Sequence, residues 1–153
     1  MLRKEFEKRT KARNGSRLKI GIVVSKFNED ITNSLMEGAR EVLKEWYVPE
    51  RNIHIAHTYG SFDLPIACQK LIKKSRLDAI VALGCIIKGE TSHDVYIAHA
   101  TFEGLMRVML DTGVPIGLGV LTTNTIEQAR ARSSGPTNHG AKAAVAALEA
   151  VFV

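Results

Sequence analysis

One short stretch of the chain, residues 88–93, combines residue types that bind anions and move protons. It reads KGETSH and follows a long apolar, β-branched run, which is typical of a strand buried on both faces of a parallel sheet. In open α/β sheets the ligand crevice lies beyond the carboxyl ends of such strands. The first turn of the next helix offers free backbone N–H groups to anions there. Because histidine exchanges protons near neutral pH, this stretch predicts an anion-binding turn with His93 as a proton carrier.

Residues of chemical interest also follow the other predicted strands. They are Lys26, Phe27 and Asn28 after the first, residues 60–65 (GSFDLP) after the second, Thr122 and Thr123 after the fourth, and Arg132 and His139 further on. Each alone has an ordinary structural explanation, since an aromatic ring can cover a sheet edge and a charged side chain can stabilise a helix end. Parallel strands, however, end at one edge of a sheet. We therefore expect these residues to gather at that edge.

Strand and helix patterns alternate along the whole chain. We expect strands at 18–24, 52–58, 78–87 and 115–121, and helices at 30–46, 64–74, 93–111, 125–132 and 140–152. His139 is expected in the turn before the last helix, which should bury Ala144, Val145, Leu148 and Phe152. Such alternation implies right-handed crossovers and a sheet covered on both faces. The predicted fold class is α/β, a flavodoxin-like three-layer α/β/α sandwich around a four-stranded parallel sheet.

Length and composition fit one soluble domain. The chain has 153 residues, 45% hydrophobic and 24% charged, and no apolar run approaches the roughly 20 residues that cross a bilayer. Residues 1–17 lack the apolar core of a signal peptide, so we expect a cytoplasmic protein without membrane contact. The two cysteines, Cys68 and Cys85, should be reduced thiols in a helix and a buried strand. Neither they nor the scattered histidines have metal-ligand spacing, so no metal is expected.

The net charge of +5 comes from the N-terminus. Residues 1–17 contain seven lysines and arginines but only two glutamates, whereas the remaining residues balance. We therefore expect a basic arm over 1–17 and a folded domain over 18–153. A nucleic-acid partner is not expected, because the arm carries no aromatic stacking platform.

Four motifs together resemble the lumazine synthase family. They are residues 18–24 with Phe27 and Asn28, residues 60–65, residues 84–93 (GCIIKGETSH), and residues 119–122 with Glu127, Gln128, Ala129 and Arg132. The resemblance extends over roughly residues 18–152, in the family's order and spacing. It implies a transferase that condenses 5-amino-6-(D-ribitylamino)uracil with 3,4-dihydroxy-2-butanone 4-phosphate to 6,7-dimethyl-8-ribityllumazine, the penultimate step of riboflavin biosynthesis. The family uses small-molecule substrates and needs no cofactor. It forms pentamers, or larger assemblies built from them.

The resemblance also assigns roles to residues. His93 would be the catalytic proton shuttle, and Phe27 would stack on the pyrimidine. The implied substrate-binding residues are Phe27, Asn28, Ser61, Phe62, Asp63, Cys85, Ile86, Ile87, Lys88, Glu90, Thr91, Leu118, Arg132 and His139. Of these, Leu118, Arg132 and His139 would reach the site from a neighbouring subunit, with Glu90, Thr91 and Arg132 on the phosphate.

Four positions depart from the family pattern. Asp63 replaces the usual glutamate, Val95 stands where an acidic residue is common, Leu118 replaces phenylalanine, and His139 replaces lysine. These changes leave two alternatives open. One is a non-catalytic protein of the same fold that binds flavins or ribityl-pyrimidines, and the other is a shell-forming homologue.

Overall fold

Four parallel strands form the central sheet of the computed structural model, which describes residues 11–153. The strands are β1 (Ile20–Ser25), β2 (Ile53–Thr58), β3 (Ala79–Ile87) and β4 (Ile116–Thr123), in the order β2-β1-β3-β4. The helices of the described residues are α2 (Glu29–Glu45), α3 (Leu64–Ser75), α4 (His93–Thr112), α5 (Ile126–Arg132) and α6 (His139–Val151), with short 3₁₀ turns at Glu50–Asn52, Ser61–Asp63 and Gly135–Thr137. The predicted alternation and parallel sheet are confirmed.

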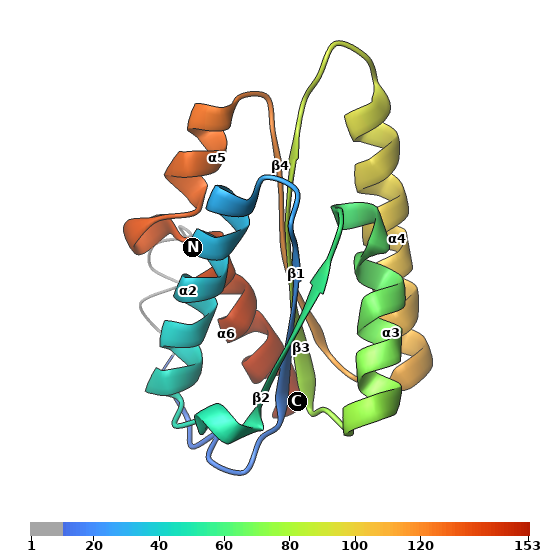
Figure 1. The fold of residues 1–153 in the computed structure, drawn as a ribbon. Coiled ribbons are helices and arrows are strands. Elements are labelled where there is room, and N and C mark those ends of the chain that lie inside the picture. The colour runs from blue at the N-terminus through green and yellow to red at the C-terminus, as the bar shows by residue number, and fades with distance from the viewer. Residues whose placement is uncertain (1–10) are drawn as a thin grey trace.

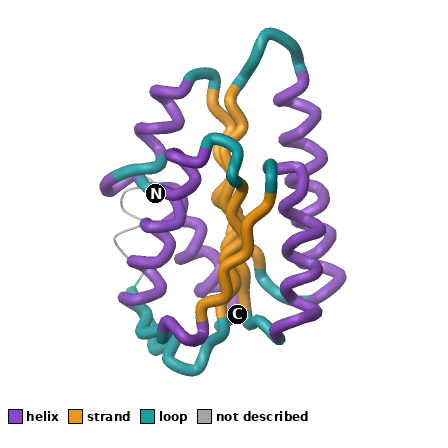
Figure 2. Tube along the Cα trace, viewed as in Figure 1, coloured by secondary structure: helices purple, strands orange, loops and turns teal. Residues whose placement is uncertain are grey.

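The helices cover both faces of the sheet. In Figure 1, α2, α5 and α6 lie on one side and α3 and α4 on the other, and Figure 2 shows the strands as a layer between them. Alternate strand residues serve the two sides. Ile20, Ile22 and Val24 pack in the cluster with α2 and α6, whereas Val23 packs in the cluster with α3 and α4. The fold is a flavodoxin-like three-layer α/β/α sandwich.

Two local predictions at the last helix are wrong. His139 is the first residue of α6 rather than part of a turn, because the side chain of Asn138 caps the helix there. Phe152 is 41% exposed rather than buried, because α6 ends at Val151 and the ring lies beyond the helical stripe. It rests on Trp46 with ring centroids 6.2 Å apart.

The basic arm lies partly outside the described residues, since nothing before residue 11 is described. The part that is described contacts the domain. Arg13 lies 5.2 Å from the centroid of the Phe152 ring and 3.9 Å from Glu149, and the Gly15 N–H donates to the Trp46 carbonyl at 2.6 Å. From residue 11 onward, no helix is both long and apolar enough to cross a membrane.

Candidate functional site

The loops after β1 and β2 are joined by backbone hydrogen bonds that continue the strand pairing. The Lys26 N–H donates to the Thr58 carbonyl at 2.8 Å, and the Phe27 N–H donates to the Tyr59 carbonyl at 3.0 Å. Phe27 is 62% exposed, Phe62 59% and Tyr59 80%. Three aromatic side chains exposed together in two adjoining loops form an apolar surface on which a planar ligand can stack.

Asn28 ties the first loop to β3. Its backbone is left-handed (φ 58°), a conformation that asparagine tolerates better than most residues. This conformation directs the side chain across the sheet edge, where Nδ2 donates to the Cys85 carbonyl at 3.0 Å. Asn28 is predicted to bind substrate, but its amide already joins the end of β1 to β3.

The second loop packs directly on β3 through Ser61 and Gly84. Ser61 is buried, and a Cβ built on Gly84 would lie 2.5 Å from its Oγ and 3.2 Å from Cδ1 of Leu64. Only glycine at position 84 leaves space for this turn to sit against the strand. Because Gly84 has no side chain, the turn that contains Ser61 packs closely on β3. Phe62 and Asp63 belong to the same turn and therefore lie near the ends of β1 and β3.

Asp63 has a structural role in the same turn. Its Oδ2 accepts a hydrogen bond from the Gly60 N–H at 3.1 Å, and the residue precedes the first turn of α3. A carboxylate is favourable at a helix N-terminus. One of the two carboxylate oxygens of Asp63 therefore stabilises the turn before α3.

Every residue of the loop after β3 is exposed to solvent, from Lys88 to the start of α4. Lys88 donates its N–H to the Thr123 carbonyl at 2.8 Å, which joins this loop to the end of β4. Glu90 and Thr91 precede the helix rather than form its first turn, and the Thr91 Oγ1 accepts the N–H of His93 at 3.3 Å. His93 itself is the first residue of α4 and is exposed to solvent. Its imidazole is thus presented at the sheet edge predicted from the sequence.

The remaining predicted residues lie elsewhere in the subunit. Arg132 ends α5, and its guanidinium donates to the Gln128 carbonyl at 3.1 Å. His139 begins α6, and Leu118 is 51% exposed on the edge strand β4. Because α5 and α4 cover opposite faces of the sheet (Figure 1), one subunit alone does not bring Arg132 and His93 onto one face.

The model of the 6,7-dimethyl-8-ribityllumazine synthase family matches residues 17–153. The chain belongs to this family. The match covers nearly the whole chain and includes every candidate residue described above. It confirms the resemblance seen in the four sequence motifs and connects the chain to riboflavin biosynthesis.

In this member of the lumazine synthase family, the Cys85 side chain is buried in β3. Burial, together with the nearby negative charge of Asp30, raises the pKa of the Cys85 thiol to about 11. Burial likewise raises the pKa of Cys68 to about 12. Both side chains are therefore neutral thiols at neutral pH, and neither has the thiolate that a nucleophile or a metal ligand needs. In residues 11–153, no three histidine, cysteine or acidic side chains gather as a metal site.

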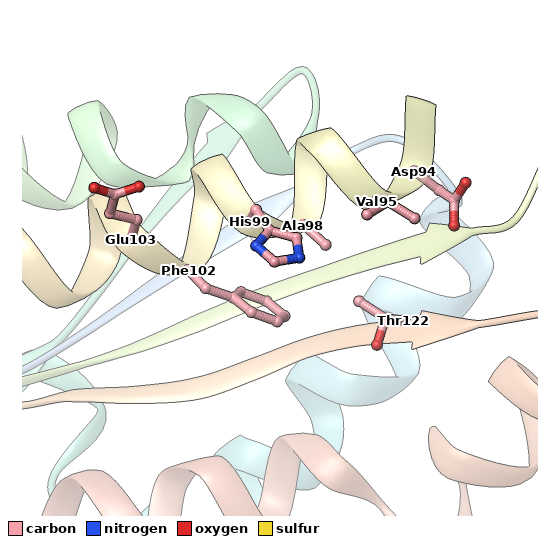
Figure 3. Close-up of a pocket in the computed structure, with 7 residues that line it drawn as sticks. All are labelled: Asp94, Val95, Ala98, His99, Phe102, Glu103 and Thr122. Atoms are coloured by element: carbon pink, nitrogen blue, oxygen red, sulfur yellow. The ribbon is translucent and has the colours of Figure 1, made fainter. Parts of the chain in front are cut away.

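A groove of about 520 Å³ runs between α4 and β4 in this family member. Its lining residues are Asp94, Val95, Ala98, His99, Phe102, Glu103 and Thr122 (Figure 3). Figure 3 shows the His99 and Phe102 rings between the helix and the strand. The groove lies along the open edge of the sheet, on the face of β4 that also carries Leu118.

Two residues at the site were not predicted as functional. Tyr59 directly follows β2, and this position at a strand end could have marked it as a candidate site residue in the sequence. Asp94 was not among the predicted site residues, and its Oδ1 is buried and receives no hydrogen bond from the described residues. It lines the groove together with Val95, the position where family members commonly carry an acid.

Replacing Gly84 with alanine should destabilise the fold by about 1–2 kcal/mol, because the new methyl group overlaps the Ser61 turn. Chemical denaturation measures this change. Gly89→Ala is the matched control, since a Cβ at Gly89 meets nothing within 4 Å. Equal stability of the two variants would contradict the packing argument.

Proposed function

We propose that this chain condenses 5-amino-6-(D-ribitylamino)uracil with 3,4-dihydroxy-2-butanone 4-phosphate to give 6,7-dimethyl-8-ribityllumazine. The observation that carries the proposal is the convergence of Phe27, Phe62 and His93 at one sheet edge in a chain of the lumazine synthase family. Membership of the family supports the chemistry, and the exposed aromatic rings and imidazole supply groups suited to it.

The pyrimidine substrate fits the loops after β1, β2 and β3. Phe27 is exposed for stacking on the ring, with Phe62 in the adjoining loop. The backbone of residues 85–87, at the end of β3, offers hydrogen-bonding groups to the ring edge, and the Ser61–Asp63 turn lies beside it for the ribityl chain. Asp63 is one methylene shorter than glutamate and already binds Gly60, so we expect a water to bridge it to the ribityl chain.

The phosphate substrate fits the exposed loop before α4. Lys88, Glu90 and Thr91 place backbone groups and a cation near the helix N-terminus, where the dipole favours an anion. Arg132 supplies a guanidinium whose planar fork matches phosphate oxygens, and His139 is the second side chain of this proposal that contacts the phosphate. Leu118 covers the pyrimidine and, like Arg132 and His139, comes from the neighbouring subunit in this proposal.

His93 moves the protons in this scheme. The primary amine of the pyrimidine attacks the ketone, and loss of water gives an imine. Elimination then breaks the C–O bond to phosphate, and closure of the second ring with loss of another water completes the product. Both waters and the phosphate come from the two substrates, so the reaction balances without an oxidant or a cofactor. Holding two reactive partners together supplies much of the acceleration, up to about 7–11 kcal/mol in favourable cases.

We further propose that the site forms between neighbouring subunits of a pentamer. His93 and Arg132 belong to opposite layers of one subunit. In this proposal a neighbouring copy supplies the Arg132 that meets His93 at one substrate. The loops after β1 and β2, which carry the exposed aromatic side chains, and the α4–β4 groove are two different surfaces. Contact between unlike surfaces is head-to-tail, and repeated by rotation it closes a ring. Native mass spectrometry tests this assembly directly, and a monomer at working concentration would contradict it.

Mixing the purified protein with both substrates tests the proposed reaction. We expect formation of the fluorescent lumazine together with one inorganic phosphate per product. Tight binding of the ribityl-pyrimidine without phosphate release would instead support the alternative of a non-catalytic binding protein.

A further inference from the structure

Asn138 connects α5, α6 and α2 through its side chain. The residue lies between α5 and α6 and is 8% exposed. Its Oδ1 accepts the N–H groups of Gly140 (2.8 Å) and Ala141 (3.1 Å), which caps α6. Its Nδ2 donates to the carbonyls of Ser133 (2.8 Å) and Ser34 (2.9 Å). All four hydrogen-bonding positions of the amide are therefore filled, by two donors on one side and two acceptors on the other.

The surroundings of this side chain fit asparagine better than aspartate. A Cβ on Gly38 would overlap the Asn138 amide, so α2 has a gap where the side chain enters. Aspartate has the same shape but lacks the two N–H groups. Its second oxygen would face the carbonyls of Ser133 and Ser34, and like-charged atoms in a buried site are unfavourable.

Helix α5 depends on such an anchor. It has seven residues, too few for a helix to be stable by itself in water. Side chains from the segment that follows bind one carbonyl in its last turn and one directly after its end. Thr137 Oγ1 donates to the Ala131 carbonyl at 2.7 Å, and Asn138 Nδ2 binds Ser133, the residue directly after Arg132. Through Ser34, Asn138 then fixes this end of α5 to α2 in the core layer.

We infer that Asn138 is a positioning residue that sets Arg132 and His139 relative to each other for phosphate binding. This inference rests on the proposed function. One amide holds the residue after Arg132 with its nitrogen and the first turn after His139 with its oxygen. Because Arg132 and His139 lie on different helices, the separation of their side chains depends on the hydrogen bonds of Asn138. The phosphate of the butanone substrate is the ligand that would sense a change.

Asn138→Asp separates the two functions of the side chain. It keeps an oxygen to cap α6 but loses both N–H donors, so the end of α5 is released from α2. We expect the Michaelis constant for the butanone phosphate and the dissociation constant of inorganic phosphate to rise about tenfold, because small misplacements of binding groups have large effects. The Michaelis constant for the pyrimidine should stay within about twofold, since its groups lie on other loops.

Thr112→Val is the matched control. Thr112 donates its hydroxyl to the Val108 carbonyl at the end of α4, so this variant also loses a side-chain bond to a helix C-terminus. It should lower stability without changing the affinity for phosphate. If Asn138→Asp fails to fold, Thr137→Val removes the neighbouring bond to Ala131 at an exposed position and should raise the phosphate constants alone.

The outcomes distinguish this inference from the proposed function. Unchanged phosphate constants in a folded Asn138→Asp variant, or in Thr137→Val if the first is unfolded, would overturn the positioning role. A parallel rise for both substrates would do the same, because it indicates general loosening. A wild-type protein that binds phosphate but makes no lumazine would refute the proposed reaction, while the phosphate-affinity comparison would still test Asn138.

Discussion

Alanine in place of His93 should lower kcat by about 10²–10⁴-fold and leave measurable turnover, because general acid–base catalysis contributes a factor of this size. The imidazole is exposed at the start of α4, where it is free to reach a bound substrate in the scheme proposed above. Residual activity is expected because the other loops still hold the two reactants together. Steady-state lumazine formation at saturating substrate gives the measurement.

His57→Ala serves as the control for the His93 variant. His57 is also an exposed histidine, but it lies on β2 and has no role in the proposed mechanism. Because His93 is solvent-exposed, its removal should leave the unfolding temperature almost unchanged. A kcat close to that of the wild type would exclude His93 as the proton carrier, and an equal loss in His57→Ala would point to an indirect effect.

Periodicity and turn chemistry predict most of this fold. The apolar run of β3 and the 3.6-residue stripe of α2 depend on local sequence, so both were recognisable without coordinates. Errors occurred at ends. The turn prediction for His139 is wrong because the Asn138 side chain caps α6 at Gly140 and Ala141, so the helix begins at His139. The core prediction for Phe152 is wrong because it extends the apolar stripe one residue beyond the end of the helix.

The sequence also predicted which residues end the strands, but not how their loops are held. The bond from Asn28 to the Cys85 carbonyl spans 57 residues, and the bond from Asn138 to the Ser34 carbonyl spans 104. No local pattern encodes contacts between such distant segments. The same limit applies to Gly84, whose strand position was clear while its contact with Ser61 was not.

Removing the guanidinium of Arg132 should raise the Michaelis constant for the butanone phosphate about 10- to 100-fold, because hydrogen bonds to charged groups contribute about 1.5–3 kcal/mol. The constant for the pyrimidine should hardly change. Arg132→Lys should fall between the wild type and Arg132→Ala, since lysine keeps the charge but loses the planar fork. Arg130→Ala is the matched control, because Arg130 lies on the same helix and is also exposed. An unchanged constant in Arg132→Ala would refute its assignment to the phosphate.

Mixed assemblies decide from which subunit Arg132 acts. If each site takes His93 from one subunit and Arg132 from its neighbour, co-expressed His93→Ala and Arg132→Ala chains form some intact sites. With equal amounts and random assembly in a ring, about one quarter of the sites contain both wild-type residues. At butanone phosphate concentrations well below the Michaelis constant, where each variant alone is impaired, activity should therefore return to about a quarter of the wild-type value. A site contained within one subunit predicts no recovery, because every chain then lacks one of the two groups.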